Sequence, residues 1–177
     1  PIASYPHGIS ILADLIGAAE DIARYDMILI LADRANQDID PFWKPREALP
    51  ETVLRTRVRW VWSRTAEQIE IQEEVGRYII EQANILNHTY SCHIKIFGTE
   101  AWKKLARLSI AVAGYVVSAS EDYQRIIVKQ EHVDFARDFL IALYDNPTFK
   151  LKEYAEHERR FATIDDNGVA LLQDIYN

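Results

Sequence analysis

The sequence predicts a mostly α-helical chain with one short strand at about residues 27–32. Two observations predict this fold class. After residue 50, apolar residues recur at the spacing of three and four that marks the buried face of a helix. Before that point, residues 27–32 read Met-Ile-Leu-Ile-Leu-Ala, an uninterrupted apolar run that is typical of a strand covered on both faces.

Two short segments flank this strand. Ile9, Leu12 and Ile16 have helical spacing, which predicts a helix that ends at Gly17 or resumes over residues 18–24. Residues 33–50 contain three prolines among Asp and Asn residues, so they are expected to form a loop.

Five helices are expected after residue 50. The first, 51–64, is edged with arginines, and its apolar face is expected to consist of Leu54, Val58, Val61 and Trp62. An extended piece at 69–72 leads into the second, at about 73–88. The third covers about 100–117, the fourth ends before Asn146-Pro147, and a weaker fifth covers 151–160.

The helix expected at 100–117 has the strongest pattern, with Thr99 as its expected N-cap. Its buried arc is predicted from Trp102, Leu105, Ser109 and further apolar residues to Val116. The basic residues Lys103, Lys104 and Arg107 are expected on the opposite, solvated face. Three of the four tryptophans, Trp60, Trp62 and Trp102, are expected in the core.

Composition excludes several classes of protein. The 177 residues include one cysteine, which rules out an internal disulfide framework, and no run approaches the ~20 apolar residues of a membrane span. A net charge of −7 argues against non-specific nucleic-acid binding by this surface. We therefore expect a cytoplasmic chain without membrane contact, and its start at a proline suggests a fragment of a longer protein.

Common nucleotide and metal motifs are missing from the sequence. Its six glycines are too far apart for a G-x-x-x-x-G-K-[ST] or G-x-G-x-x-G loop, so the chain by itself is not expected to hydrolyse ATP. His88, Cys92 and His93 lack a fourth ligand at the usual spacing, and no metal site is predicted.

One segment resembles a known family. Residues 23–26, Ala-Arg-Tyr-Asp, precede the apolar run, and Asp33 and Asp40 follow it. This order is similar to the Ser-Arg-Phe-Asp motif and last core strand of minichromosome maintenance (MCM) helicases, which are AAA+ ATPases. The later helices, including Trp62-Ser63-Arg64, Arg107-Leu108 and His132-Val133, resemble an AAA+ helical lid. The resemblance covers about residues 5–145.

The resemblance assigns roles to four residues. Arg24 matches the arginine finger that completes the ATP site of the neighbouring subunit, while Arg107, with Lys103 and Lys104, is a candidate second phosphate sensor. Two positions depart from the family: Ala23 replaces serine, and Glu100 occupies the place of the sensor arginine. Without the resemblance, Arg24 would be expected to pair with Glu20 or Asp21, and the basic stripe to be a solvated face.

The resemblance also implies an organisation and an activity. Residues 1–50 would end an AAA+ core, 51–145 would form the lid, and 146–177 would begin a further element. The full-length protein would be an ATP- and Mg²⁺-dependent DNA helicase or remodelling ring, a homo-hexamer that binds DNA through upstream parts. Alternatives are a non-catalytic helical protein-interaction module and the lid of another AAA+ branch that does not act on DNA.

Overall fold

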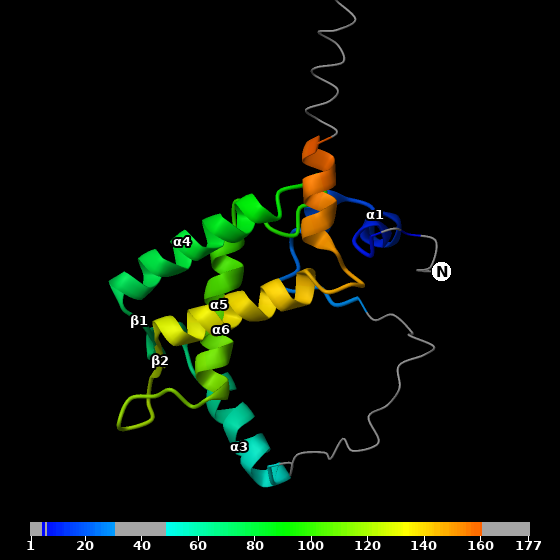
Figure 1. Cartoon of the computed structure of the whole chain (residues 1–177). Coiled ribbons are helices and arrows are strands. Elements are labelled where there is room, and N and C mark those ends of the chain that lie inside the picture. The colour runs from blue at the N-terminus through cyan, green and yellow to red at the C-terminus, as the bar shows by residue number, and fades with distance from the viewer. Residues whose placement is uncertain (1–4, 6, 31–48, 161–177) are drawn as a thin grey trace, which may run out of the picture.

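The computed structural model describes residues 5, 7–30 and 49–160, and this part of the chain is mostly helical with one two-stranded parallel sheet (Figure 1). Residues 33–48 of the loop expected at 33–50, and the residues after 160, lie outside the described part of the chain. Within the described ranges, no helix combines the length and the apolar character needed to cross a membrane.

The helices follow the order expected from the sequence. Their bounds are α1 (Ser10–Ile16), α2 (Ala19–Ile22), α3 (Glu51–Trp62), the 3-10 turn η2 (Ala66–Gln68), β1 (Ile69–Ile71), α4 (Glu73–Thr89), α5 (Ala101–Tyr115), β2 (Ile126–Val128) and α6 (Gln130–Tyr144). A further helix covers 151–160, up to the last residue described.

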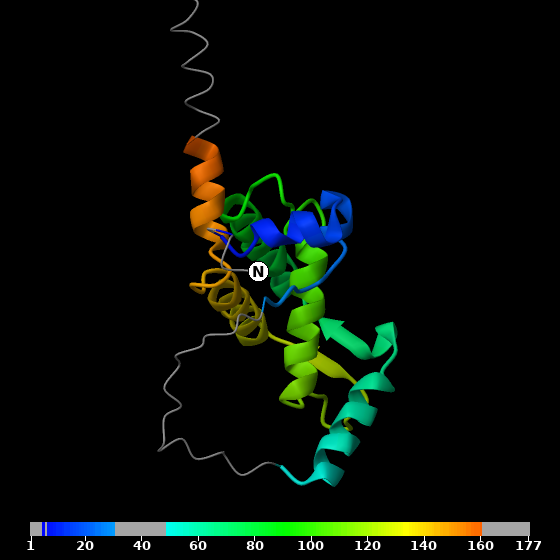
Figure 2. The same ribbon diagram turned by 90° about the vertical axis from the view of Figure 1, so that its right-hand side faces the viewer.

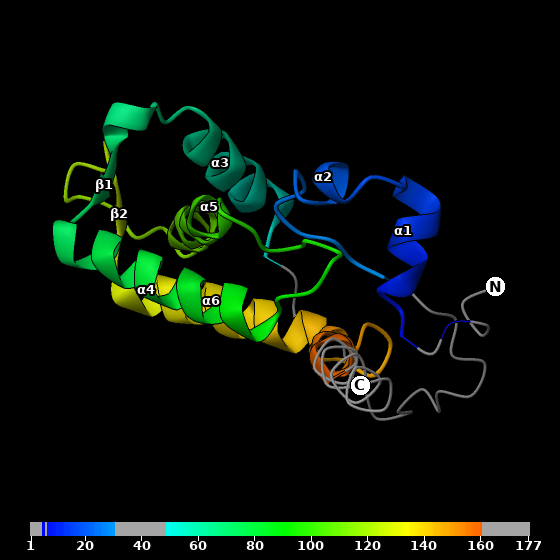
Figure 3. The same cartoon turned by 90° about the horizontal axis from the view of Figure 1, so that it is seen from above.

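Helix α5 is the centre of the fold. It contacts α4 and α6 on one side and α3 on the other, so that α3 and α6 lie on opposite sides of it (Figure 3). The two strands pair in parallel, with Ile69 opposite Ile126 and Ile71 opposite Val128, beside the end of α5 that packs against α3 (Figure 2).

The main core lies where α4, α5 and α6 meet the last helix. Leu105, Val133, Leu140 and Tyr144 are fully buried there, and Tyr144 contacts Phe149 edge to face with ring centroids 5.0 Å apart. Burial of several large side chains, each worth about 1.5–3 kcal/mol, accounts for the association of these helices.

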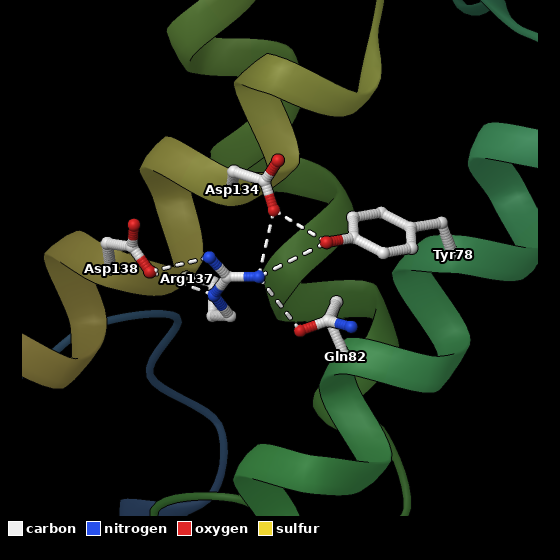
Figure 4. Close-up of polar contacts among 5 residues, drawn as sticks. All are labelled: Tyr78, Gln82, Asp134, Arg137 and Asp138. Atoms are coloured by element: carbon white, nitrogen blue, oxygen red, sulfur yellow. Dashed lines mark hydrogen bonds and ion pairs between the residues drawn. The ribbon is translucent and has the colours of Figure 1, made fainter.

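A polar cluster joins α4 to α6 beside this core (Figure 4). Arg137 Nη1 donates to Gln82 Oε1 at 3.0 Å and to Asp134 Oδ1 at 2.8 Å, and the Tyr78 hydroxyl donates to the same Asp134 oxygen at 2.6 Å. Asp138 accepts from Nε of Arg137 at 2.8 Å. The guanidinium is thus shared between two helices, which fixes their register.

The N-terminal segment packs against the chain that enters the last helix (Figure 2). Ile9 N donates to Phe149 O at 3.3 Å, and a Cβ built at Gly8 would lie 2.0 Å from Thr148 O. Only glycine permits this approach. Gly17, at φ +85°, ends α1 as the sequence predicts.

The prediction of a strand at 27–32 is wrong over the residues that the structure describes. Residues 27–30 are extended but belong to no sheet, and residues 31 and 32 lie outside the described part. Ile28 and Ile30 pack against the core while Leu29 is 57% exposed. The apolar run therefore covers helices, and the strands are formed by β1 and β2 instead.

The prediction of which residues form the buried face of α3 is also wrong. Val61 packs toward α5, but Leu54, Val58 and Trp62 are exposed, Trp62 by 84%. The side that meets α5 is turned toward Arg57, which lies over the Tyr115 ring at 5.4 Å. Helical spacing identified an amphipathic helix but could not say which flank would meet a neighbour.

Helix α5 shows the same kind of rotation. Leu105, Ser109 and Ala113 are buried as predicted, but Trp102 and Val116 are exposed. Lys104, expected on the solvated face, is only 5% exposed. Nor does Thr99 cap the helix, because its N-cap is Glu100 and no side chain caps it.

Candidate functional site

A cleft of about 640 Å³ opens between α2, the 87–100 segment and the first turns of α5. Its lining contains four residues that the sequence singled out, namely Arg24, Lys103, Lys104 and Arg107. Arg24 follows α2 and the other three belong to α5, which lies far from α2 in the chain. The fold thus brings the predicted finger and sensor residues into one site.

Arg24 follows the last turn of α2 and reaches the cleft beside Asp21. Its Nη1 donates to Asp21 Oδ1 at 3.0 Å. This is the local ion pair expected for Arg24 if the resemblance to the MCM family is set aside. The Arg24 side chain is still 80% exposed. Exposed pairs of this kind contribute about 1 kcal/mol or less, so an anion in the cleft can compete for the guanidinium.

Arg107 is held by a carboxylate from the other side of the cleft. Its Nη1 donates to Asp26 Oδ1 at 2.7 Å, across 81 positions of sequence. The Asp26 side chain is 42% exposed and that of Arg107 61% exposed. This contact ties the segment after α2 to α5.

Lys103 also has a carboxylate partner, since it pairs with Glu100 one turn earlier. The Lys103 ammonium lowers the pKa of Glu100, first through the hydrogen bond and then through its charge. Glu100, the residue that departs from the family pattern, therefore neutralises a cation of the same cleft.

Lys104 forms part of the floor of the cleft. Its ammonium donates to the carbonyl oxygen of Ile96. Burial lowers the pKa of Lys104, and the charge of Arg107 lowers it further, whereas Asp26 and Glu100 act in the opposite direction. Lys104 is a positioned cation rather than a solvated one.

The lining has a surplus of positive charge in an acidic chain. Five cationic side chains face three carboxylates, those of Glu20, Asp26 and Glu100. Guanidinium groups bind phosphate through two parallel hydrogen bonds, and ammonium groups add point charge. An arrangement of two arginines and three lysines around one cleft is suited to a polyanion with several oxygens.

Two residues of the cleft were not predicted from the sequence. Lys95 lies in the segment between α4 and α5 and lines the cleft, and Asp26 provides the partner of Arg107. No periodicity marks Lys95, because it lies outside a helix. Asp26 stood within the quoted motif, but only the fold could show what it contacts.

A second hollow of about 470 Å³ lies between α3 and the loop after α5. Val53, Trp60, Val117 and Tyr123 line it, and the Trp60 indole N–H donates to Tyr123 O at 2.8 Å. It contains one cation, Arg57, and is otherwise mainly apolar. It has none of the charge concentration of the first cleft.

The cysteine and histidines near the cleft do not form a catalytic pair. Cys92 Sγ donates to Ile94 O at 3.1 Å, and burial raises the pKa of this thiol to about 12, which keeps it protonated. His93 pairs with Glu158 of the last helix. Among the described residues no group of three or more His, Cys, Asp and Glu side chains could hold a metal ion.

Searches of protein-family models, curated proteins and solved structures found no match to this chain.

Proposed function

We propose that this chain is the C-terminal part of the ATPase module of an MCM-like AAA+ protein. Its cleft would contact the terminal phosphates of ATP bound by the neighbouring subunit of a hexameric ring. One observation carries the proposal: Arg24 and Arg107, which belong to separate parts of the family pattern, line the same cleft. ATP and Mg²⁺ would bind to a phosphate-loop part that this sequence does not contain.

The proposed chemistry rests on electrostatic stabilisation. Charge develops on the oxygens of the transferred phosphoryl group, and a guanidinium supplied by the adjacent subunit stabilises it, an effect of about 10³ to 10⁵ in rate in comparable enzymes. Arg24 would act as this finger after leaving Asp21. Arg107, Lys103 and Lys104 would register the phosphates and couple them to movement of the lid.

In the full-length ring this activity would move or remodel DNA, with DNA contacts made outside the present chain. Arg24→Ala should leave nucleotide affinity nearly intact and reduce steady-state ATP turnover at least about a hundredfold. Mixing this variant with a subunit that lacks the phosphate-loop lysine should restore part of the activity, because each subunit provides what the other lacks. Unchanged ATP turnover in Arg24→Ala would refute the role of Arg24 as an arginine finger.

The cleft itself can be tested on the 177-residue chain. Inorganic tripolyphosphate, titrated calorimetrically, should bind to the native chain and bind at least about tenfold more weakly to Arg24→Ala and to Arg107→Ala. Arg77→Ala is the matched control, because Arg77 is equally exposed and pairs with Glu73 within α4. Equal affinity in all four proteins would contradict a phosphate site.

A second candidate function is the non-catalytic protein-interaction module. The exposed apolar residues of α3 and α6 favour it, since Trp62 is 84% exposed and Phe135 is 61% exposed. This candidate predicts no tripolyphosphate binding and no effect of Arg24 on turnover, so the same two experiments separate the alternatives.

A further inference from the structure

Two exposed apolar helix faces of this chain carry borders of opposite charge. The first, the α3 ridge, consists of Leu54, Val58 and Trp62, which succeed each other at intervals of four residues. These side chains are 40%, 47% and 84% exposed, and α3 contributes no buried residue at all. A 12-residue helix with an open apolar ridge needs a partner to cover it.

Basic residues edge the α3 ridge. Arg55 and Arg59 flank it on the outward side, while the one acidic residue of the helix, Glu51, pairs with Arg55 at 2.6 Å. Among the described residues Arg59 has no ion-pair partner. The ridge is therefore an apolar strip with a net positive border.

The second face, the α6 stripe, consists of Glu131, Phe135, Asp138 and Phe139. The two phenylalanines are 61% and 43% exposed, and the carboxylates stand on the same side of the helix. At about 100° per residue this stripe lies opposite the buried arc of Val133, Ala136 and Leu140. It is an apolar strip with an acidic border, in which Asp138 also pairs with Arg137 at 2.8 Å and Glu131 lies 3.9 Å from Lys129.

The two faces belong to helices that α5 keeps apart. Helix α5 separates α3 from α6, and the two helices lie on opposite sides of it (Figure 3). One copy cannot bring its own ridge onto its own stripe. Two unlike faces on opposite sides of one body produce head-to-tail contacts, which close into a ring when the rotation allows it.

We infer that the α3 ridge of one copy docks on the α6 stripe of the next. Trp62 and the two phenylalanines would form the apolar centre of this contact, and the arginines would meet Glu131 and Asp138 at its border. The inference names the contact between neighbouring subunits of the proposed ring, and closure of these contacts into a ring rests on the proposed function. The contact itself depends only on the two faces.

The test uses sedimentation velocity on the 177-residue chain at low and high salt. Native chains should associate with increasing concentration, and less so at high salt because screening weakens the charged border. Trp62→Asp inactivates the ridge and Phe135→Asp the stripe, and each should weaken self-association at least about tenfold. Leu15→Asp is the control, an equally exposed apolar residue on α1 at 73%.

The decisive sample is an equimolar mixture of Trp62→Asp and Phe135→Asp. One partner keeps a working stripe and the other a working ridge, so a heterodimer should form and grow no further. Association of Trp62→Asp alone would show a stripe-to-stripe contact and overturn the inference, as would association of Phe135→Asp alone through paired ridges. Monomeric native chains would overturn it as well.

The results of the association experiment can be distinguished from those of the tripolyphosphate titration. Because Trp62 and Phe135 do not line the cleft, both variants should bind tripolyphosphate with native affinity. Circular dichroism and thermal unfolding check that both variants fold. Loss of association with intact tripolyphosphate binding supports the docking surface, whereas docking without tripolyphosphate binding would refute the phosphate site alone.

Discussion

Arg107 on α5 and Asp26 after α2 form an ion pair at 2.7 Å across the cleft that contains Arg24. The pair occupies the guanidinium that phosphate would use, and it links the segment after α2 to α5. Together with Arg24–Asp21 and Lys103–Glu100, it gives each of the three exposed cations that the sequence singled out a carboxylate partner. An incoming anion must exchange with these carboxylates.

Asp26→Asn should therefore raise the affinity of the chain for tripolyphosphate. Removing the carboxylate frees Arg107, and a surface ion pair of up to about 1 kcal/mol corresponds to an increase of about two- to fivefold. Calorimetric titration measures it, with Glu73→Gln, which frees Arg77 on α4, as the control. An unchanged affinity would mean that Arg107 does not reach the anion.

Gly114 should be required for the contact between α3 and α5. A Cβ at this position would lie 2.9 Å from Val61 Cγ2, so Gly114→Ala must displace the Val61 side chain or the helix that carries it. Gly76→Ala is the matched control, because Gly76 lies within α4 with no atom within 4 Å of its added Cβ. Both changes gain the same helix propensity, and urea unfolding should find Gly114→Ala about 1–3 kcal/mol less stable than Gly76→Ala. Equal stabilities would show that the helices can separate without cost.

The Arg137 cluster should contribute more to stability than an exposed ion pair does. Arg137→Ala leaves Gln82, Asp134 and Tyr78 without their shared donor in a partly buried site (Figure 4). We expect a loss of about 2 kcal/mol in the free energy of unfolding. Arg77→Ala, which removes an exposed pair of α4, should cost less than about 0.5 kcal/mol. Similar losses in the two variants would contradict this role.

His132 should make α6 sensitive to acid. Its Nδ1 accepts a hydrogen bond from Lys129 N at 2.9 Å, and burial lowers the pKa of this imidazole. The unfolded chain therefore binds the proton more tightly. The stabilisation is fully present above the unfolded pKa of about 6.5 and is lost as pH falls through the lower folded pKa.

Denaturant unfolding between about pH 7 and about pH 5 measures this effect, and one lost hydrogen bond corresponds to about 1 kcal/mol. His132→Gln provides the comparison, because an amide at this position can accept the same backbone hydrogen bond without titrating. Its unfolding free energy should change less over this range than that of the native chain. Parallel pH profiles in the two proteins would rule out His132 as the titrating group.

The sequence by itself determined the order, type and approximate bounds of the helices. Helical periodicity is a local property of the sequence, so it can be recognised without knowing which elements pack together. Helices α4, α5 and α6 lie where this periodicity predicted them. The apolar run at 27–30 was misleading because a segment that covers helices and a strand inside a sheet both require buried side chains. The sequence could not tell these two coverings apart.

Only the tertiary structure decided which arc of each helix is buried and which distant groups meet. Lys104 lies inside and Trp62 outside because the packing partners of α5 and α3, not their own spacing, set the buried side. The sequence named Arg24 and Arg107, but their common cleft and the carboxylate of Asp26 depend on contacts across 81 positions. Such contacts follow from how the helices pack, and local spacing carries no information about them.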